Sequence, residues 1–332
     1  YTTLFRSDNT GDILAAAELA VSQVTAVLNR GKLTSQGNLS LDTAALSGGG
    51  SVTAENTVTA DAAVLEQDGH LQGRTVTLRG NSLSHRGTVI GTDALTLKFA
   101  GNAESFSSGK LLSNGNITVS AENITGDGLW QSAGMDISAG NYRTGGTRQA
   151  DNDLNLTVRG ETEVAAAGVL QAGKTLTIDT GTADNKGNIA AGNTALTAGR
   201  LLNSGKLLVE NNLILNTPVL TQAAGGQLLA GNALRHTGDE WHNQGRIQAA
   251  DVNIEAVQGE NSGSIQAGDI TLHQQQALNN RTGGEIRAQN NLSLTVQSAD
   301  NRGLITSAGS LTAAVAKMLV SHGQWSAQGH QT

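Results

Sequence analysis

The sequence predicts an all-β fold, a right-handed parallel β-helix of about 17 coils. Three observations predict it: a glycine that returns every 19.5 residues on average, a strand-like alternation after each such glycine, and an aromatic content of 2%. So few aromatic residues could not fill the two compact cores that 332 residues would suggest. Aliphatic residues and alanine must instead fill many small, similar sites, as they do in a stacked array of repeats.

The leading glycine marks the start of each coil. It recurs at Gly11, Gly31, Gly50, Gly69, Gly87, Gly109, Gly128, Gly146, Gly168, Gly187, Gly205, Gly226, Gly245, Gly263, Gly284, Gly303 and Gly323. Two residues after it the position is apolar in 16 of 17 repeats, with Arg148 as the exception. Four residues after it the position is Ala, Gly or Ser in 16 of 17, with Val209 as the exception. This is the period of a strand that buries one face.

A turn and a second strand follow, so each repeat of about 19 residues holds two or three short strands. Gly, Asn or Asp, which tolerate left-handed backbone angles, usually stands six residues after the leading glycine. The second strand reads apolar-x-apolar, as in Leu39-Ser-Leu41 and Ile270-Thr-Leu272, and its middle residue, which we expect to face outward, is mostly Ser or Thr. At about 4.8 Å per coil, seventeen coils would make a rod of roughly 75–80 Å.

An asparagine often stands two residues before the leading glycine. The examples are Asn29, Asn185, Asn203, Asn243, Asn261 and Asn301. Asparagines that stack at one corner can hydrogen-bond from coil to coil through their amides. The sequence therefore predicts an asparagine ladder along the helix.

Every third coil is longer than its neighbours. From Gly50 the spacings run 19, 18, 22; 19, 18, 22; 19, 18, 21; 19, 18, 21. The extra residues fall within Lys98–Ser108, Arg159–Ala167, Asn216–Gly225 and His273–Gly283, so we expect bulges that align on one edge. Pro218, the only proline, lies in one of them, where no ladder hydrogen bond is required. If the protein contacts a partner, the candidate residues are those of this edge: Phe99, Phe106, Arg159, Pro218, His273 and Arg281.

The aromatic and histidine residues are expected in different places. Trp130 and Trp325 occupy inward positions, whereas Trp241 lies off the pattern, near a corner, where it could be exposed. Phe99 and Phe106 either pack under the first bulge or offer an aromatic ring to a partner. His236 and His242 flank Glu240 with irregular spacing, which favours exposed, unliganded histidines over a metal site. We expect no metal and no cofactor.

The repeat resembles the haemagglutinin repeats of filamentous haemagglutinin and of contact-dependent growth-inhibition exoproteins. Asn261-Ser-Gly-Ser-Ile-Gln-Ala-Gly-Asp-Ile-Thr-Leu272 carries the resemblance well, and it extends over residues 8 to 332. The resemblance implies a secreted or cell-surface shaft, export through an outer-membrane transporter partner, and contact with an unidentified host or neighbouring-cell receptor or glycan. Val209-Glu-Asn-Asn212 spells the tetrapeptide that marks the toxin boundary in the growth-inhibition proteins, but here it fits an ordinary coil.

Other functions are less well supported. A β-helix enzyme that degrades polysaccharides would need stacked outward carboxylates, and here the outward position holds Ser or Thr. No Lys/Arg run exceeds two residues, which argues against nucleic-acid binding, and no apolar run approaches the roughly 20 residues of a membrane span. A chain without cysteine suits export in an unfolded state. The shaft is therefore the expected function, and a receptor-binding segment of a growth-inhibition protein is the alternative.

The first seven residues need a separate interpretation. Tyr1-Thr-Thr-Leu-Phe-Arg-Ser7 matches the in-frame translation of a common sequencing-adapter oligonucleotide, so we exclude residues 1–7 from the predicted fold. Residues 8–332 are expected to form a single β-helix that is a fragment of a larger protein.

Overall fold

The computed structural model describes residues 5–330 and 332 and contains 32 strands. Among the described residues there is no helix, and the paired strands run parallel, which confirms the predicted all-β, parallel β-helical fold. No helix in this part of the chain could therefore cross a bilayer. The chain divides into two compact units: unit 1 comprises residues 1–160 and 168–173, and unit 2 comprises residues 161–167 and 174–332.

The strands of unit 1 are β1 (Arg6–Asn9), β2 (Asp12–Ala15), β3 (Glu18–Asn29), β4 (Lys32–Ser35), β5 (Asn38–Ser47), β6 (Ser51–Ala54), β7 (Thr57–Gln67), β8 (His70–Gly80), β9 (Ser82–His85), β10 (Thr88–Phe99), β11 (Asn102–Ser105), β12 (Lys110–Ser113), β13 (Asn116–Gly126), β14 (Leu129–Ser132), β15 (Gly134–Thr144) and β16 (Thr147–Ala150). Two further strands, β17 (Leu154–Val164) and β18 (Val169–Asn185), contain residues of both units.

The strands of unit 2 are β19 (Asn188–Asn203), β20 (Lys206–Val209), β21 (Leu213–Asn216), β22 (Val219–Gln222), β23 (Gln227–Ala230), β24 (Ala233–Thr237), β25 (Glu240–Asn243), β26 (Arg246–Asn261), β27 (Ser264–Asn280), β28 (Glu285–Ala288), β29 (Leu292–Asn301), β30 (Leu304–Ser307), β31 (Leu311–Ser321) and β32 (Gln324–Ala327).

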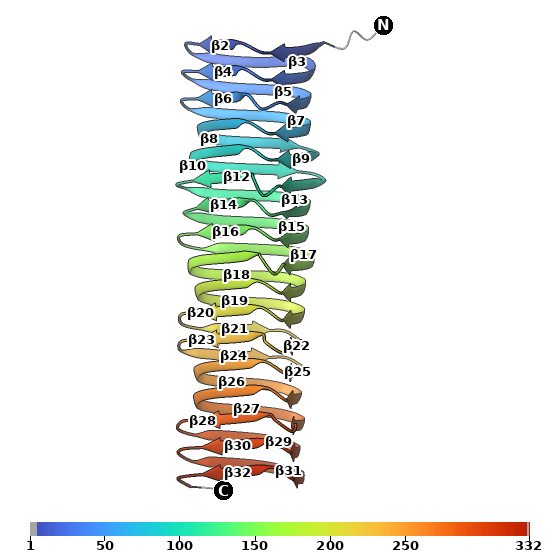
Figure 1. The fold of residues 1–332 in the computed structure, drawn as a ribbon, viewed down its shortest axis with the longest axis vertical. Helices are drawn as coiled ribbons and strands as arrows, with labels where there is room; N and C mark the ends of the chain where they lie inside the picture. Colours follow the sequence, from blue (N-terminus) through green and yellow to red (C-terminus); the bar gives the residue numbers. More distant parts are fainter. Residues whose placement is uncertain (1–4, 331) are drawn as a thin grey trace. The chain divides into compact units, whose positions relative to one another are not determined.

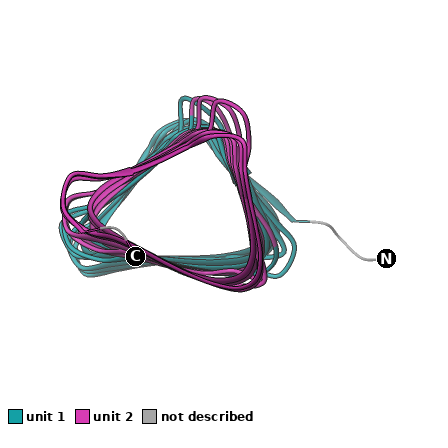
Figure 2. Ribbon diagram, turned by 90° about the horizontal axis from the view of Figure 1, so that it is seen from below, with its two compact units in different colours: residues 1–160, 168–173 teal, residues 161–167, 174–332 magenta. Residues whose placement is uncertain are grey.

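Each coil has three faces, which Figure 1 shows from the side and Figure 2 along the coils of each unit. The first face follows the leading glycine, the second carries the apolar-x-apolar strand, and the third leads to the next leading glycine. In the coil of Gly205 these faces are β20, β21 and β22, which pair with β23, β24 and β25 of the next coil. Of the residues of the predicted adapter segment, 1–4 lie outside the described residues, and Arg6 and Ser7 pair with Ala26 and Val27.

The core follows the predicted alternation. On the first face the large apolar residue is buried, and examples from β12 and β23 are Leu111 and Leu228, both with 0% exposure. The small residue two positions later, such as Ala230, is buried as well. Val209, the exception to the small-residue rule, is also buried, and residues 210–212 form the turn before β21. The toxin-boundary tetrapeptide therefore lies in an ordinary coil, as predicted.

Two expectations about exposure are wrong. Trp241 is buried, with 1% exposure, and its Nε1 donates to Gln274 Oε1 at 3.0 Å. It fits because the residue paired with it in the next coil is Gly259, where a Cβ would lie 2.2 Å from Trp241 Cε2. His236 is also buried, with 1% exposure, at the inward position that its paired neighbours Leu215 and Ile254 fill with aliphatic side chains. Trp130 is buried as predicted, whereas Trp325 is half-buried.

The predicted asparagine ladder exists, and it is longer than the sequence showed. In unit 2 the inward residue at the end of the third face is, coil after coil, Asn185, Asn203, Gln222, Asn243, Asn261, Asn280 and Asn301, and we call this set the amide ladder. Its side chains bond to one another at 2.7–2.8 Å, from Asn185 to Gln222 and again from Asn243 to Asn301. Their side-chain amide nitrogens also donate to backbone carbonyls of following coils, as Asn203 Nδ2 does to Gln227 O (3.1 Å). Every member is buried, so the ladder satisfies polar groups that water cannot reach.

In unit 1 the inward position at the end of the third face is filled by other residue types. Its ladder begins with Asn9 and Asn29, whose amides bond at 2.8 Å, but farther along the corresponding position is Gln67, His85, Ser105, Gly126 and Thr144. Gly126 has no side chain, so it cannot contribute a side-chain amide to a ladder. Arg148, on the first face of the coil that follows Thr144, points inward and donates to Gly128 O (2.6 Å) and Gly126 O (3.3 Å).

Arg148 is the one residue that is not apolar two positions after a leading glycine, and its buried contacts account for it. Its guanidinium lies 3.9 Å above the ring of Trp130, and the side chain has 0% exposure. Burial lowers the pKa of Arg148 and raises that of the adjacent buried Tyr142. Trp130 Nε1 in turn donates to Ser105 Oγ (3.2 Å), which also bonds His85 Nδ1 (3.0 Å). A polar chain thus replaces the amide ladder in this part of unit 1.

Candidate functional site

Most of the extra residues of the long coils form a recurring turn directly before the leading glycine. The turns are 106–109, 165–168, 223–226 and 281–284. In three of them the glycine N–H bonds back to the first carbonyl of the turn: Gly109 to Phe106 at 2.8 Å, Gly226 to Ala223 at 3.0 Å and Gly284 to Arg281 at 2.9 Å. These turns confirm the three-coil superperiod in the backbone itself.

In unit 2 two of these turns share one corner. The N–H groups after each leading glycine bond to the glycine carbonyl of the coil before, from Arg246 to Gly226 and from Ser264 to Gly245. Turns 223–226 and 281–284 are therefore stacked three coils apart. Gly225 and Gly283 both have φ +83, which is the angle that a type II turn requires at its third residue. The sequence predicted that the bulges align on one edge. In unit 2 the structure places turns 223–226 and 281–284 at one corner, directly before the leading glycine.

The six candidate partner-binding residues do not all lie at that corner. Phe106 and Arg281 begin turns 106–109 and 281–284. Pro218 stands between β21 and β22, at the corner between the second and third faces, and Arg159 and His273 lie exposed on β17 and β27. Phe99, at the end of β10, is buried, so it packs in the core and does not present its ring to solvent.

Three of these residues contact charged side chains of neighbouring coils. The guanidinium of Arg86 lies 3.8 Å above the ring of the half-buried Phe106. Arg281 pairs with Glu260 at 2.7 Å, and Arg159 pairs with Glu122. These ion pairs join residues of different coils at an exposed surface, where such pairs contribute little to stability.

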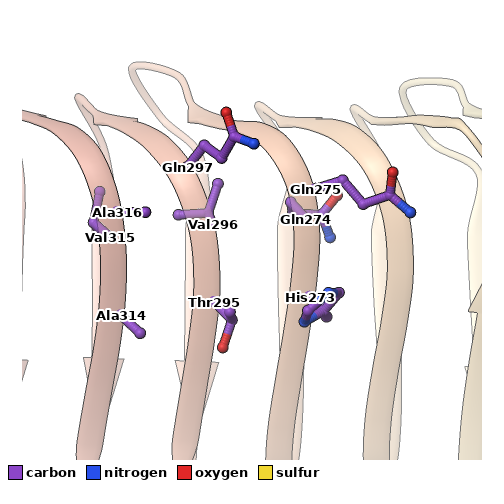
Figure 3. A pocket seen from close by; sticks show the side chains of 9 residues that line it. All are labelled: His273, Gln274, Gln275, Thr295, Val296, Gln297, Ala314, Val315 and Ala316. Carbon is purple, nitrogen blue, oxygen red and sulfur yellow. The ribbon is translucent and has the colours of Figure 1, made fainter.

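A groove of about 380 Å³ lies on unit 2 beside one of the candidate residues. Figure 3 shows its two outer rows, His273, Thr295 and Ala314 on one side and Gln275, Gln297 and Ala316 on the other. The buried Val296 and Gln274 and the half-buried Val315 lie between the rows. Of these residues the sequence had indicated only His273. The run Gln274-Gln275-Gln276 in a long coil is the only sequence feature that could have indicated the other groove residues.

The groove follows a β-bulge. Ala256 pairs with Gln274 and Gln258 with Ala277, so β27 has one residue more than β26 at this point. The same shift recurs against β29, where Gln297 faces both Gln275 and Gln276. Bulges re-aim side chains, and here the bulge places Gln275 at the rim.

The histidine cluster does not form a metal site in the structure. His236 is buried, and His242 Nε2 lies 3.8 Å from Glu240 Oε2. Among the described residues no group of three or more His, Cys, Asp or Glu side chains could hold a metal ion. Burial lowers the pKa of His236 to about 4, and it lowers the pKa of His85 to about 4 as well.

Comparison with known proteins identifies the family. The family profile described as haemagglutinin repeat matches residues 6–65, 132–198, 189–251 and 242–323. The chain belongs to the haemagglutinin-repeat family. Proteins of this family are secreted and surface-exposed, and the repeats form their structural shaft.

Similar curated proteins include three exoproteins named CdiA. The tRNA nuclease CdiA of Escherichia coli strain NC101 is 29% identical over 311 residues, which cover 92% of this chain and 10% of that protein. The deoxyribonuclease CdiA of Dickeya dadantii strain 3937 is 31% identical over 238 residues, 70% of this chain and 7% of that protein. The toxin CdiA of Escherichia coli is 30% identical over 305 residues, 92% of this chain and 9% of that protein. The chain therefore spans at most a tenth of these relatives, and no solved structure matches it.

Proposed function

We propose that this chain is a segment of the shaft of a secreted bacterial adhesin or toxin-delivery exoprotein. In this role it is not an enzyme, and it holds binding or effector regions away from the cell surface. The observation that supports this most is the axial stacking within each unit, where coil pairs with coil and buried polar groups bond along the axis. Such an array resists bending because each coil is fixed by the one before and the one after.

The proposal extends to export and location. Family membership supports two-partner secretion, so we propose an outer-membrane transporter as the partner during export and an outer-membrane-associated filament as the final location. The nuclease activities named for the relatives would belong to their other regions, because this chain matches only repeats. A host or neighbouring-cell receptor remains part of the proposal.

A deletion of one superrepeat tests the shaft role. Removing residues 168–225 from a parent exoprotein joins Ala167 to Gly226, so that one four-residue turn is rebuilt from the first three residues of turn 165–168 and the last residue of turn 223–226. The coil pattern is kept and the shaft loses three coils, about 14 Å of reach. We expect normal export and adhesion or target-cell inhibition. A deletion of residues 168–196 breaks the coil pattern and is expected to abolish export or folding.

The alternative outcome distinguishes a receptor-binding segment. If the superrepeat deletion is exported and folded but no longer binds or inhibits target cells, then these coils carry the recognition site and the spacer role is wrong.

A further inference from the structure

Turn 114–115 carries the one Asn-Gly pair of the sequence. It lies between β12 and β13, at the corner where the first face ends, and Asn114 is exposed. Within the described part of the chain no hydrogen bond holds the side-chain amide of Asn114. An asparagine before glycine is the pair most open to attack by the next backbone nitrogen, because glycine has no Cβ to obstruct the approach.

The backbone nitrogen of Gly115 is not held by a carbonyl of the preceding coil. At the same position of two other coils of unit 1, the N–H groups of Asn56 and Asn152 donate to such carbonyls at 3.1 and 2.8 Å. The N–H of Gly115 donates instead to Ser113 Oγ in its own coil, at 3.1 Å. A hydroxyl can rotate away from its partner. The Gly115 nitrogen can therefore be released without breaking a hydrogen bond between coils.

The packing of the coils keeps glycine at position 115. A Cβ there would overlap the backbone oxygen of Asp93 in the preceding coil. No larger residue fits without moving the backbone, so the pair that makes Asn114 reactive is required by the fold.

Turn 36–37 has the same arrangement without the asparagine. The N–H of Gly37 donates to Ser35 Oγ at 3.2 Å, and a Cβ at Gly37 would overlap the backbone oxygen of Ala17. The residue before this glycine is the exposed Gln36. Its longer side chain would have to close a six-membered ring, which forms more slowly than a five-membered one. The chain thus contains its own control for the chemistry of Asn114.

We propose that Asn114 is a site of spontaneous deamidation, with water as the co-reactant. The Gly115 nitrogen loses its proton and attacks Asn114 Cγ. The new C–N bond closes a five-membered succinimide while the Cγ–Nδ2 bond breaks, and Nδ2 leaves with a proton as ammonia. Water then opens the ring. Opening at Cγ leaves an aspartate at position 114, and opening at the backbone carbonyl leaves an isoaspartate, in which the chain runs through Cγ.

The product changes this corner of unit 1 in two ways. Either opening leaves a new carboxylate, and the corner of the preceding coil already holds Asp93, which pairs with Arg74 at 2.9 Å. Like charges on neighbouring strands repel each other. An isoaspartate also adds one carbon to the backbone between β12 and β13, whose registers are fixed on both sides. We therefore expect local opening at this corner. This chemistry goes beyond the shaft role and does not depend on it.

Ageing of the folded 332-residue chain tests the proposal. The protein is kept at mildly alkaline pH, which favours loss of the backbone proton, and is followed by peptide-mapping mass spectrometry and isoaspartate-specific methylation. We expect Asn114 to convert, with isoaspartate among the products, while Gln36 and the exposed Asn232 keep their amides. Hydrogen exchange should become faster at β12 and β13 of the aged protein and stay unchanged at β20 and β21. The proposal is overturned if Asn114 converts only in chain unfolded by guanidinium chloride, or if it converts no faster than Asn232.

Two reciprocal variants locate the cause in the turn. Asn114→Gln gives residues 113–115 the sequence Ser-Gln-Gly of residues 35–37, and it should abolish the conversion. Gln36→Asn creates a second Ser-Asn-Gly turn, which should convert at a rate similar to that of Asn114. Circular dichroism of the fresh variants verifies that each keeps its strands. Isoaspartate formation that persists at turn 114–115 in Asn114→Gln, or a Gln36→Asn chain that stays unmodified at turn 36–37, contradicts the role given to the Ser-Asn-Gly turn.

Discussion

Asn261 lies in the middle of the amide ladder, and Asn261→Ala is expected to destabilise unit 2 more than any surface substitution. Asn261 Nδ2 donates to Asn280 Oδ1 at 2.8 Å, and its own Oδ1 accepts from Asn243 Nδ2 at 2.8 Å. It also reaches the carbonyls of Gly263 and Glu285, both at 3.3 Å. All three ladder amides are buried, so water cannot replace the missing partner.

The magnitude follows from these contacts. Two side-chain hydrogen bonds are lost, and each contributes about 1 kcal/mol net. Asn280 Oδ1 and the two carbonyls are left with fewer partners inside the core, where an unsatisfied group costs about 1–3 kcal/mol. We therefore expect a loss of about 3–5 kcal/mol in the free energy of unfolding. That is a large part of the about 5–15 kcal/mol that holds a typical domain.

The assay has to resolve local opening, because a repeat array need not unfold in one step. Hydrogen exchange of the β25–β28 backbone amides measures the local free energy directly, and urea unfolding followed by circular dichroism measures the unit. Asn232→Ala is the control, since Asn232 is exposed and its amide lies 3.5 Å from Asn211 Oδ1. A loss below about 1 kcal/mol for Asn261→Ala, no larger than for the control, would refute the stabilising role of the ladder.

Three further predictions address the core. Gly259→Ala should destabilise unit 2 by about 1–3 kcal/mol, because the added Cβ would overlap Trp241. Gly49→Ala is the control and should not destabilise the protein, because nothing lies within 4 Å of its added Cβ. In a double-mutant cycle of thermal unfolding, Trp241→Leu should reduce the loss of stability that Gly259→Ala causes. Arg148→Lys keeps a buried charge but loses the planar contacts with Trp130 and two carbonyls, so we expect a loss of about 2–4 kcal/mol, against almost none for the exposed Arg159→Lys. In the folded protein burial lowers the pKa of His236 to about 4 from the usual value of 6.5 that applies to the unfolded chain. Between these two pH values the unfolded chain binds a proton that the folded protein does not. The free energy of unfolding is therefore full above pH 6.5 and falls by up to about 3 kcal/mol as the pH drops toward 4. His236→Leu should flatten this slope in urea unfolding series between pH 7 and pH 4, and an unchanged slope would assign the acid sensitivity to other groups.

The sequence alone determined the coil, its period and the first two of its three faces. Leu111 and Leu228 could be placed inward, and the long coils that contain turns 106–109, 223–226 and 281–284 could be found from the spacings alone. This works because each coil offers its neighbour the same environment, so the local pattern of large, small and turn residues is enough to fix the backbone.

Tertiary structure decided what happens where a coil departs from the pattern. Trp241 fits in the core because Gly259 stands opposite it, and Arg148 is buried where it stacks on Trp130 and donates to the carbonyls of Gly128 and Gly126. The groove lies where β27 carries one residue more than both of its neighbours. For Trp241 and Arg148 the deciding partner lies about one coil away along the axis, so no window around the residue itself contains the reason.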